Sequence, residues 1–184
     1  LYDALDGRTI RDLTEGEIVI AAVLKAVESY TDKYADLTFY LPELDEVLGD
    51  MTFASAADDL ADITVAALLN TVGAYLDEYV GENYVLASLP ALFGEMTLGQ
   101  IGDEDEGILS LSVNGIIGVI RDYAAEYASA EYVVEELTTL FPADMTLGNA
   151  SDKLEETGIS NILAVVKAYA DMADDRIVQQ SVVD

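Results

Sequence analysis

The sequence predicts an all-α fold of tandem two-helix repeats of about 46 residues, which form an α-solenoid or an extended helical array. Three observations support this prediction. A short motif recurs as GDMTFAS (49–55), GEMTLGQ (94–100) and ADMTLGN (143–149), and one tyrosine follows each copy at a similar distance. Apolar residues around these tyrosines recur at spacings of three and four, which place a single apolar stripe along a helix.

The motif has the pattern of a helix N-terminus. Its threonine is followed three residues later by a polar side chain, as in a reciprocal capping pair. These pairs are Thr9 with Asp12, Thr52 with Ser55, Thr97 with Gln100, and Thr146 with Asn149. The residue before the threonine and the one four after it hold the positions of a hydrophobic staple, which Arg8 breaks in the first copy. The motif therefore predicts a turn that ends one helix and starts the next.

Each repeat is expected to carry a long helix of roughly 15 to 20 residues with one buried face. The positions 10, 7, 6 and 3 before each repeat tyrosine, and 4 after it, are apolar or aromatic in all four copies. The repeat tyrosines are Tyr30, Tyr75, Tyr123 and Tyr169. In the second repeat the stripe consists of Val65, Leu68, Leu69, Val72 and Tyr79.

A second, shorter helix is predicted between each tyrosine and the next motif. Its first two copies, FYLPELDEVLG and YVLASLPALFG, end in Gly49 and Gly94, where a residue that tolerates positive φ closes a helix. The third copy has Pro142 instead. We expect Pro42 in the first turn of this helix and a local distortion at Pro90.

The repeats divide the chain into 1–38, 39–83, 84–131 and 132–177, with 178–184 as the start of a further repeat. The first repeat lacks most of its first helix. Leu1 aligns with Leu44 and Asp184 with Asp45, so both alignments fall inside the shorter helix. The sequence therefore predicts a window of four periods from a longer array.

Charge and composition exclude several classes of function. The chain carries 36 acidic and 8 basic residues, a net charge of −28 that repels phosphate backbones, so we expect no nucleic-acid partner. No apolar run reaches the roughly 18 residues of a membrane span, so we expect no membrane insertion. Cys, His and Trp are absent, which removes thiol nucleophiles, imidazole bases and Cys/His metal sites. We therefore expect no enzymatic activity, no catalytic residue and no organic cofactor.

One acidic segment is a candidate metal site. The sequence GDEDEG (102–107) places Asp103, Glu104, Asp105 and Glu106 together, and such a density of oxygen ligands suits calcium. The spacing is not that of an EF-hand, because Asn114 stands where the twelfth-position glutamate belongs. The alternative is a solvated insertion whose acids favour the N-terminal dipole of the following helix.

The tyrosines allow two interpretations. The chain has eleven tyrosines and four phenylalanines, and exposed tyrosines can stack on sugar rings. Seven of the tyrosines keep the register of the repeat. This register favours rings packed between repeats, with hydroxyl groups that reach water or a neighbouring loop.

The recurring DMTLG-type turn between short helices resembles that of tandem-repeat, all-helical surface proteins of anaerobic Gram-positive bacteria. The resemblance implies an extracellular or cell-surface protein with a structural or adhesive role, and it implies no catalytic residue. A halophilic cytosol would also explain the acidity.

The functional expectation is a structural repeat segment of an extracellular stalk, fibre or filament. Its partners are further repeats of the same chain, or copies of itself arranged head to tail, with residues 177–184 of one copy replacing the short helix missing before Thr9 in the next. The alternative is an acidic solenoid that binds a peptide, a glycan or a cationic partner, in a form that calcium could stabilise.

Overall fold

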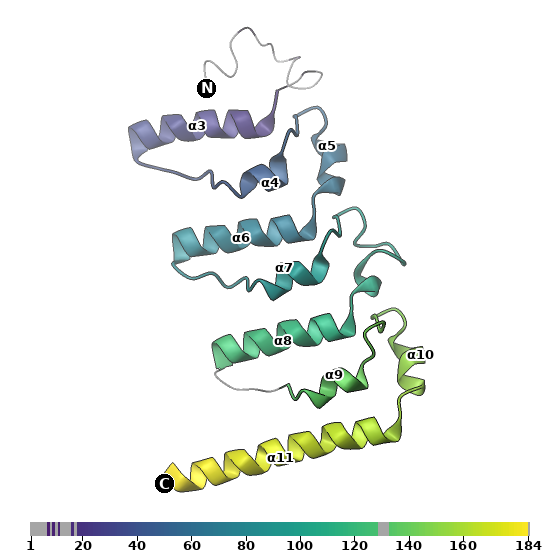
Figure 1. The fold of residues 1–184 in the computed structure, drawn as a ribbon. Coiled ribbons are helices and arrows are strands. Elements are labelled where there is room, and N and C mark those ends of the chain that lie inside the picture. The colour runs from purple at the N-terminus through teal and green to yellow at the C-terminus, as the bar shows by residue number, and fades with distance from the viewer. Residues whose placement is uncertain are drawn as a thin grey trace. The chain divides into compact units, whose positions relative to one another are not determined.

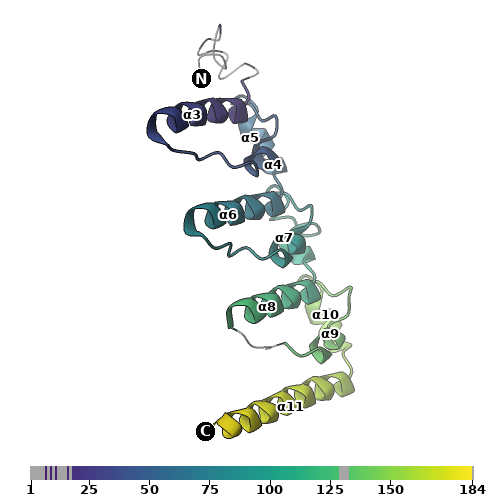
Figure 2. The same cartoon turned by 60° about the vertical axis from the view of Figure 1, so that its left-hand side comes forward.

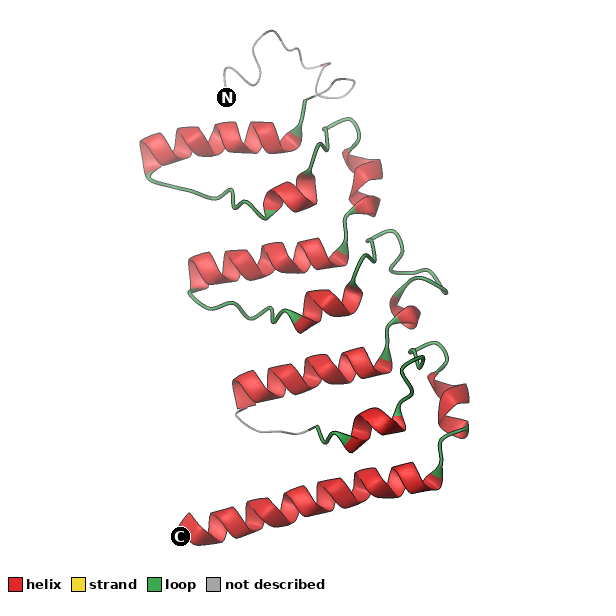
Figure 3. Cartoon of the chain, in the orientation of Figure 1, coloured by secondary structure: helices red, strands yellow, loops and turns green. Residues whose placement is uncertain are grey.

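The computed structural model describes residues 18–128 and 133–183 of the 184-residue chain, together with positions 7, 9, 11 and 16. The chain is mostly helical (62%), and its described residues contain isolated β-bridges but no strand (Figure 3). The predicted all-α class is therefore confirmed. The chain divides into two compact units, Leu1–Asp103 (unit 1) and Glu104–Asp184 (unit 2), which are described separately. Arg8 and Asp12 of the first motif copy lie outside the described residues.

Long and short helices alternate along unit 1. Its elements are α3 (Ile20–Ala35), α4 (Leu44–Leu48), α5 (Ala56–Asp59), the 3-10 helix η1 (Leu60–Asp62), α6 (Val65–Val80) and α7 (Ser88–Phe93). The short helix α4 contacts both long helices, α3 and α6, and α6 also contacts α7. Figures 1 and 2 both show α4 between α3 and α6.

Unit 2 also contains two long helices with short helices between them. Its elements are the 3-10 helix η2 (Ile108–Ser110), α8 (Val113–Ala128), α9 (Glu136–Leu140), α10 (Ala150–Glu155) and α11 (Ile159–Val183). The short helix α9 contacts the last long helix, α11 (Figure 1).

The long helices begin at the predicted apolar stripes. Helices α3, α6 and α8 each have 16 residues, within the expected length. The first two end at residues in the left-handed region, Asp36 (φ 49°) and Gly81 (φ 80°). The N–H group of each end residue donates to carbonyls of the last helical turn, which is a common way to terminate an α-helix.

Helix α11 is longer than the others and corrects one expectation. It has 25 residues and continues without a break through 177–183, where the sequence predicted the start of a separate short helix. No Gly or Pro occurs from Ile159 to Val183. An aspartate, Asp175, holds the position of Gly81, but Asp36 holds the same position in α3 and ends that helix in the left-handed region. The absence of Gly and Pro therefore permits the longer helix and does not by itself explain it.

The short helices are shorter than predicted but end where expected. Helices α4 and α7 end at Gly49 (φ 46°) and Gly94 (φ 53°), as predicted. Pro42 lies in the turn just before α4, not in its first turn. Pro90 is buried in the first turn of α7, where a missing N–H group breaks no helical hydrogen bond, so it causes no distortion.

The Met-Thr turn forms backbone hydrogen bonds with the start of the long helix that precedes it. The Met51 carbonyl accepts a hydrogen bond from the Ile20 N–H at 2.9 Å, at the first residue of α3. The same bond joins Val65 to Met96 at 2.8 Å and Val113 to Met145 at 3.0 Å, at the starts of α6 and α8. A second bond returns from the residue after the threonine, as from Leu98 N–H to the Ile63 carbonyl at 2.9 Å. Each turn thus forms a short antiparallel bridge with the residues that precede a long helix.

Apolar burial coincides with these bridges. The turn methionines Met51, Met96 and Met145 are 5%, 8% and 0% exposed. Residues on the opposite side of the bridges, Ile18, Ile63 and Leu111, are also buried. Long, flexible methionine side chains fill irregular gaps between helices well.

The capping prediction is confirmed as a reciprocal pair at Thr52 and Ser55, is seen in one direction at Thr97 and Thr146, and is wrong in its position. The Thr52 N–H donates to Ser55 Oγ and the Ser55 N–H returns to Thr52 Oγ1, both at 3.1 Å. Gln100 and Asn149 accept from their threonine N–H groups at 2.8 Å. However, the helix that follows Ser55 is the short α5, not the long α6. Thr64 caps α6 instead, because its Oγ1 accepts from the Ala67 N–H at 3.1 Å.

The burial of Met145 leads to a stability prediction. We expect Met145→Ala to lower the free energy of unfolding by about 2–5 kcal/mol, because it removes a fully buried side chain and leaves a cavity. Urea denaturation of the whole chain, followed by circular dichroism, measures this change. Ile120→Ala, at a residue of α8 that is 54% exposed, is the control and should cost below about 1 kcal/mol. Equal losses in the two variants would contradict a special role for the turn.

Candidate functional site

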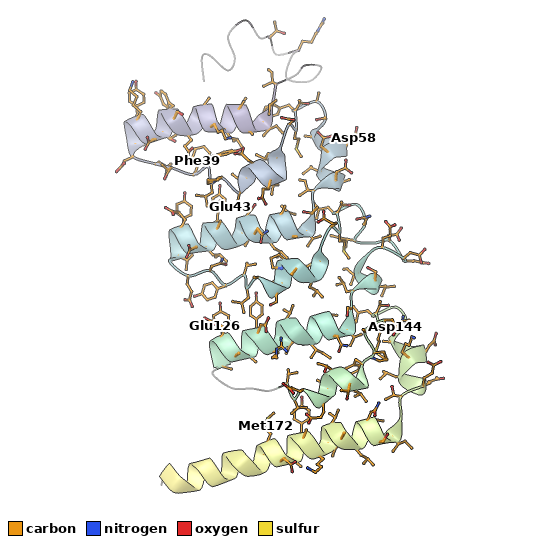
Figure 4. The ribbon with its side chains drawn as sticks, in the orientation of Figure 1. Phe39, Glu43, Asp58, Glu126, Asp144 and Met172 are labelled. Carbon is orange, nitrogen blue, oxygen red and sulfur yellow. The ribbon has the colours of Figure 1, made fainter. Side chains whose placement is uncertain are left out.

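The candidate site is the contact between the long helix α6 and the segment that follows the previous long helix, α3. Helix α6 carries three hydroxyl groups that donate to backbone carbonyls of the segment between α3 and α4. Tyr79 donates to Thr38 at 2.6 Å, Tyr75 donates to Phe39, and the buried Thr71 donates to Glu43 at 3.2 Å. Figure 4 labels Phe39 and Glu43 on this segment. We call these three contacts the α6 seat.

The seat explains why tyrosines keep the repeat register. Tyr75 and Tyr79 are one helical turn apart, and their ring centroids are 5.8 Å from each other in a stacked arrangement. Burial raises the pKa of the Tyr75 hydroxyl above its usual value, so the hydroxyl stays protonated as a donor well above neutral pH. The hydroxyl groups of both residues reach a neighbouring loop, as predicted. Tyr75 is half-buried, whereas Tyr79 is 52% exposed. The packing of these rings between repeats stays a prediction.

The tyrosine pair of α3 has a different environment. The rings of Tyr30 and Tyr34 lie 4.6 Å apart but are 60% and 65% exposed. Tyr123 and Tyr127 of α8 form a third pair at 5.8 Å. The i, i+4 tyrosine pair is therefore a property of each of these helices, whereas the exposure of its side chains depends on which segment packs against the helix.

A carboxylate holds the segment that forms the seat. Glu28 of α3 accepts from the N–H groups of Phe39 and Tyr40 at 2.8 and 2.6 Å. The Tyr40 hydroxyl donates to Asp45 at 2.8 Å, and Lys25 pairs with Asp45 at 2.7 Å. Burial raises the pKa of Tyr40, and the hydrogen bond from Lys25 holds the pKa of Asp45 below its usual value. This network anchors the carbonyls to which α6 binds.

Sequence reasoning missed this network because it occurs in only one repeat. In the register of the tyrosines, Gly73 of α6 holds the position of Glu28. The next loop is held by Asn83 instead, whose Oδ1 accepts from the Val85 N–H at 2.8 Å. A Cβ atom on Gly73 would lie 2.7 Å from this Oδ1 atom, so the glycine provides the space that Asn83 occupies.

An open groove lies beside a short helix in each unit. The groove of unit 1 has a volume of about 570 Å³ and is lined by four acidic side chains, Glu43, Glu46, Asp77 and Glu78. The groove of unit 2 has a volume of about 560 Å³, and its lining includes Asn114 and one basic side chain, Arg121, beside two acidic ones, Glu135 and Glu136. Asn114 donates from Nδ2 to the Phe141 carbonyl at 2.5 Å, and its buried Oδ1 has no hydrogen-bond partner. The grooves therefore differ in charge.

The predicted calcium segment lies in an exposed turn. Asp103, Glu104, Asp105 and Glu106 are all exposed, at the point where unit 1 ends and unit 2 begins. No group of three or more acidic side chains among the described residues is arranged to hold a metal ion. Calcium binding by this segment stays a prediction. Other acidic residues lie on the short helices: Asp58, which Figure 4 labels, and Asp59 on α5, Asp62 on η1, and Asp152 and Glu155 on α10.

No helix in the part of the chain that the structure describes is both long and apolar enough to cross a membrane. Comparisons of the chain with protein families, with curated proteins and with solved structures gave no match in any of the three.

The removal of one hydroxyl group tests the α6 seat. We expect Tyr75→Phe to lower the free energy of unfolding by about 1 kcal/mol, because the Phe39 carbonyl loses its donor in a half-buried position. Tyr30→Phe is the matched control, since Tyr30 holds the same position on α3 and is 60% exposed, and it should change stability little. Urea denaturation of both variants measures the difference. Indistinguishable values would show that the hydroxyl does not stabilise the seat.

Proposed function

We propose that this chain is a non-enzymatic structural segment in which tandem two-helix repeats stack as an α-solenoid or extended helical array. In this proposal the segment belongs to an extracellular stalk, fibre or filament. Each repeat buries its apolar stripe only against its neighbours, so each repeat positions the next one and the segment needs no ligand.

The observation that carries the proposal is the recurrence of the Met-Thr bridge. The same two backbone hydrogen bonds occur at Met51, Met96 and Met145, and each joins a turn to the start of the preceding long helix. Hydrogen bonds of the same type at the same register indicate one supersecondary unit used repeatedly.

The α6 seat supports the stacking of one long helix on the segment that follows the previous one. Its three donors and the acceptors Phe39 and Glu43 belong to the predicted repeat 39–83, while Tyr79 donates across the predicted boundary to Thr38. The acceptors are backbone carbonyls, which any loop sequence offers, so the contact tolerates changes of side chain from copy to copy. This tolerance suits an array whose repeats differ in sequence.

Composition supports the absence of catalysis, and the resemblance of the motif turn supports an extracellular location. The absence of His and Cys leaves few groups for acid-base or nucleophilic chemistry. The net charge of −28 keeps a chain that is 52% hydrophobic in solution. The resemblance of the DMTLG-type turn to bacterial surface repeats favours an extracellular location, and antibody labelling of intact producing cells would test it.

An in-phase deletion tests the repeat architecture. Removing residues 52–96 joins Met51 to Thr97 and takes out one whole repeat. We expect this variant to keep its helical signal per residue and a cooperative thermal transition, because each repeat contacts only its neighbours.

The control deletion removes only residues 52–74 and joins Met51 to Tyr75 in the middle of a long helix. It should lose helical signal per residue and cooperativity, and far-UV circular dichroism measures both variants. If the two deletions behave alike, the chain is not built from interchangeable repeats.

A second candidate function is an acidic module that binds a cationic peptide. The groove of unit 1 favours it, because Glu43, Glu46, Asp77 and Glu78 converge on a volume of about 570 Å³. Clefts lined by charges of one sign concentrate the opposite charge.

An oligolysine peptide tests this candidate. We expect it to bind at low ionic strength and to weaken as salt rises, because the attraction is screened. The variant Glu43→Gln with Glu46→Gln should weaken binding more than the control Asp103→Asn with Asp105→Asn, which removes the same charge elsewhere. Isothermal titration measures both. Equal weakening would indicate general charge attraction and no binding groove.

A further inference from the structure

Each Met-Thr bridge closes part of the chain into a loop. The second bridge pairs Thr64 with Thr97, so the long helix α6 and the short helix α7 both lie within the enclosed residues 64–97. The first bridge encloses α3 and α4 within residues 19–52 in the same way. The chain enters and leaves each loop at its bridge, and the short helices α5 and η1 connect the first loop to the second (Figure 1). A pull on the two ends of the chain therefore acts on the bridges before it acts on the helices inside the loops.

The hydrogen bonds of a bridge meet such a pull one after another. In the second bridge the outer bond joins the Leu98 N–H to the Ile63 carbonyl, at the end where the chain enters and leaves the loop. The inner bond joins the Val65 N–H to the Met96 carbonyl, further into the loop. Because the pairing is antiparallel, tension breaks the outer bond before it loads the inner one. Bonds that break in succession resist a smaller force than the same bonds loaded together.

Two further contacts keep the second bridge closed when no force acts. Met96 and Ile63 beside it are buried, so opening would expose their apolar side chains to water. The Gly99 N–H also donates to the Ala61 carbonyl at 2.8 Å, and this bond lies outermost. A Cβ atom on Gly99 would lie 3.1 Å from that carbonyl oxygen, which is closer than Cβ atoms usually approach, so glycine suits this position.

We propose that each Met-Thr bridge is a force-sensitive clasp, which opens under tension and releases its long and short helix as extra chain length. A loop such as residues 64–97 spans about 110 Å when it is extended, at roughly 3.3 Å per residue. The clasp consists of non-covalent contacts within one chain, so it closes again when the tension falls. This inference rests on the proposed stalk or fibre, which carries tension between its ends, and it states how the repeats respond.

A reversible covalent lock tests the clasp. Thr64 and Thr97 form the non-hydrogen-bonded pair of their bridge, and the Cα atoms of such pairs lie about 4.5 Å apart, within reach of a disulfide. The chain has no cysteine of its own, so Thr64→Cys with Thr97→Cys can form only one disulfide within the molecule. The whole chain is attached by its two ends and stretched in optical tweezers, first oxidised and then in a thiol reductant.

We expect the unaltered chain to lengthen in steps of about 110 Å, one for each of the three described bridges. The oxidised double-cysteine chain should lose one of these steps, and the reductant should restore it. Comparison of the two redox states of one variant cancels any effect of the substitutions themselves. A chain that extends in a single step, or steps that the disulfide leaves unchanged, would overturn the proposal.

Two glycine variants test the order in which the clasp opens. Gly99→Ala places a Cβ atom against the Ala61 carbonyl, whereas the matched control Gly102→Ala places one where nothing lies within 4 Å. We expect Gly99→Ala to lower the force of one step without changing its length, and Gly102→Ala to leave all the forces unchanged. Circular dichroism verifies that both variants keep their helices. Equal forces in the two variants would overturn the opening from the outermost bond.

These outcomes are separate from those of the proposed function. A chain that extends in a single step, but whose in-phase deletion still folds cooperatively, would remove the clasp and leave the stacked repeats. Stepwise extension of a chain whose in-phase deletion unfolds would remove the interchangeable repeats instead.

Discussion

The fold depends on a backbone bridge between the Met-Thr turn and the start of the preceding long helix. The first N–H groups of an α-helix have no partner within the helix, so something else must accept from them. Here the methionine carbonyl does so, at 2.8–3.0 Å in the three described turns. The same residue buries its side chain, so one position satisfies a polar group and fills a gap between helices. The bridge therefore places each Met-Thr turn beside the first residue of the long helix that precedes it.

The side chains that hold the loops after the long helices differ between copies. Glu28 holds the loop after α3 through two N–H groups, whereas Asn83, in space left by Gly73, holds the loop after α6. Both solutions hold a loop through its backbone N–H groups, and the loop held by Glu28 presents the carbonyls to which α6 binds. Different side chains therefore anchor loops that hold the same place after a long helix.

The surface combines strong acidity with apolar faces that the chain covers unevenly. The first stripe residues of α6, Val65, Leu68 and Leu69, are half-buried, while their counterparts in α11, Ile159, Ile162 and Leu163, are exposed. Large exposed apolar patches on soluble proteins mark interaction surfaces. The negative charge opposes indiscriminate association, so contacts that do form need shape and local charge that match.

The sequence by itself determined the helical class, the long helices and the ends of two short helices. A stripe such as Val65, Leu68 and Leu69 depends only on helical period, and Gly49 and Gly94 depend only on local backbone freedom, so both can be recognised in the sequence. The capping bonds of Thr52 and Ser55 were also predictable, because their partners lie three residues apart. Tertiary structure decided which helix each cap precedes, the bridge from Met96 to Val65, and the loop anchors Glu28 and Asn83. These contacts join residues far apart in the sequence, or differ from copy to copy, so no local pattern records them. The exposure of Ile159 and Leu163 likewise depends on what packs against α11, because their residue types match those of the covered helices.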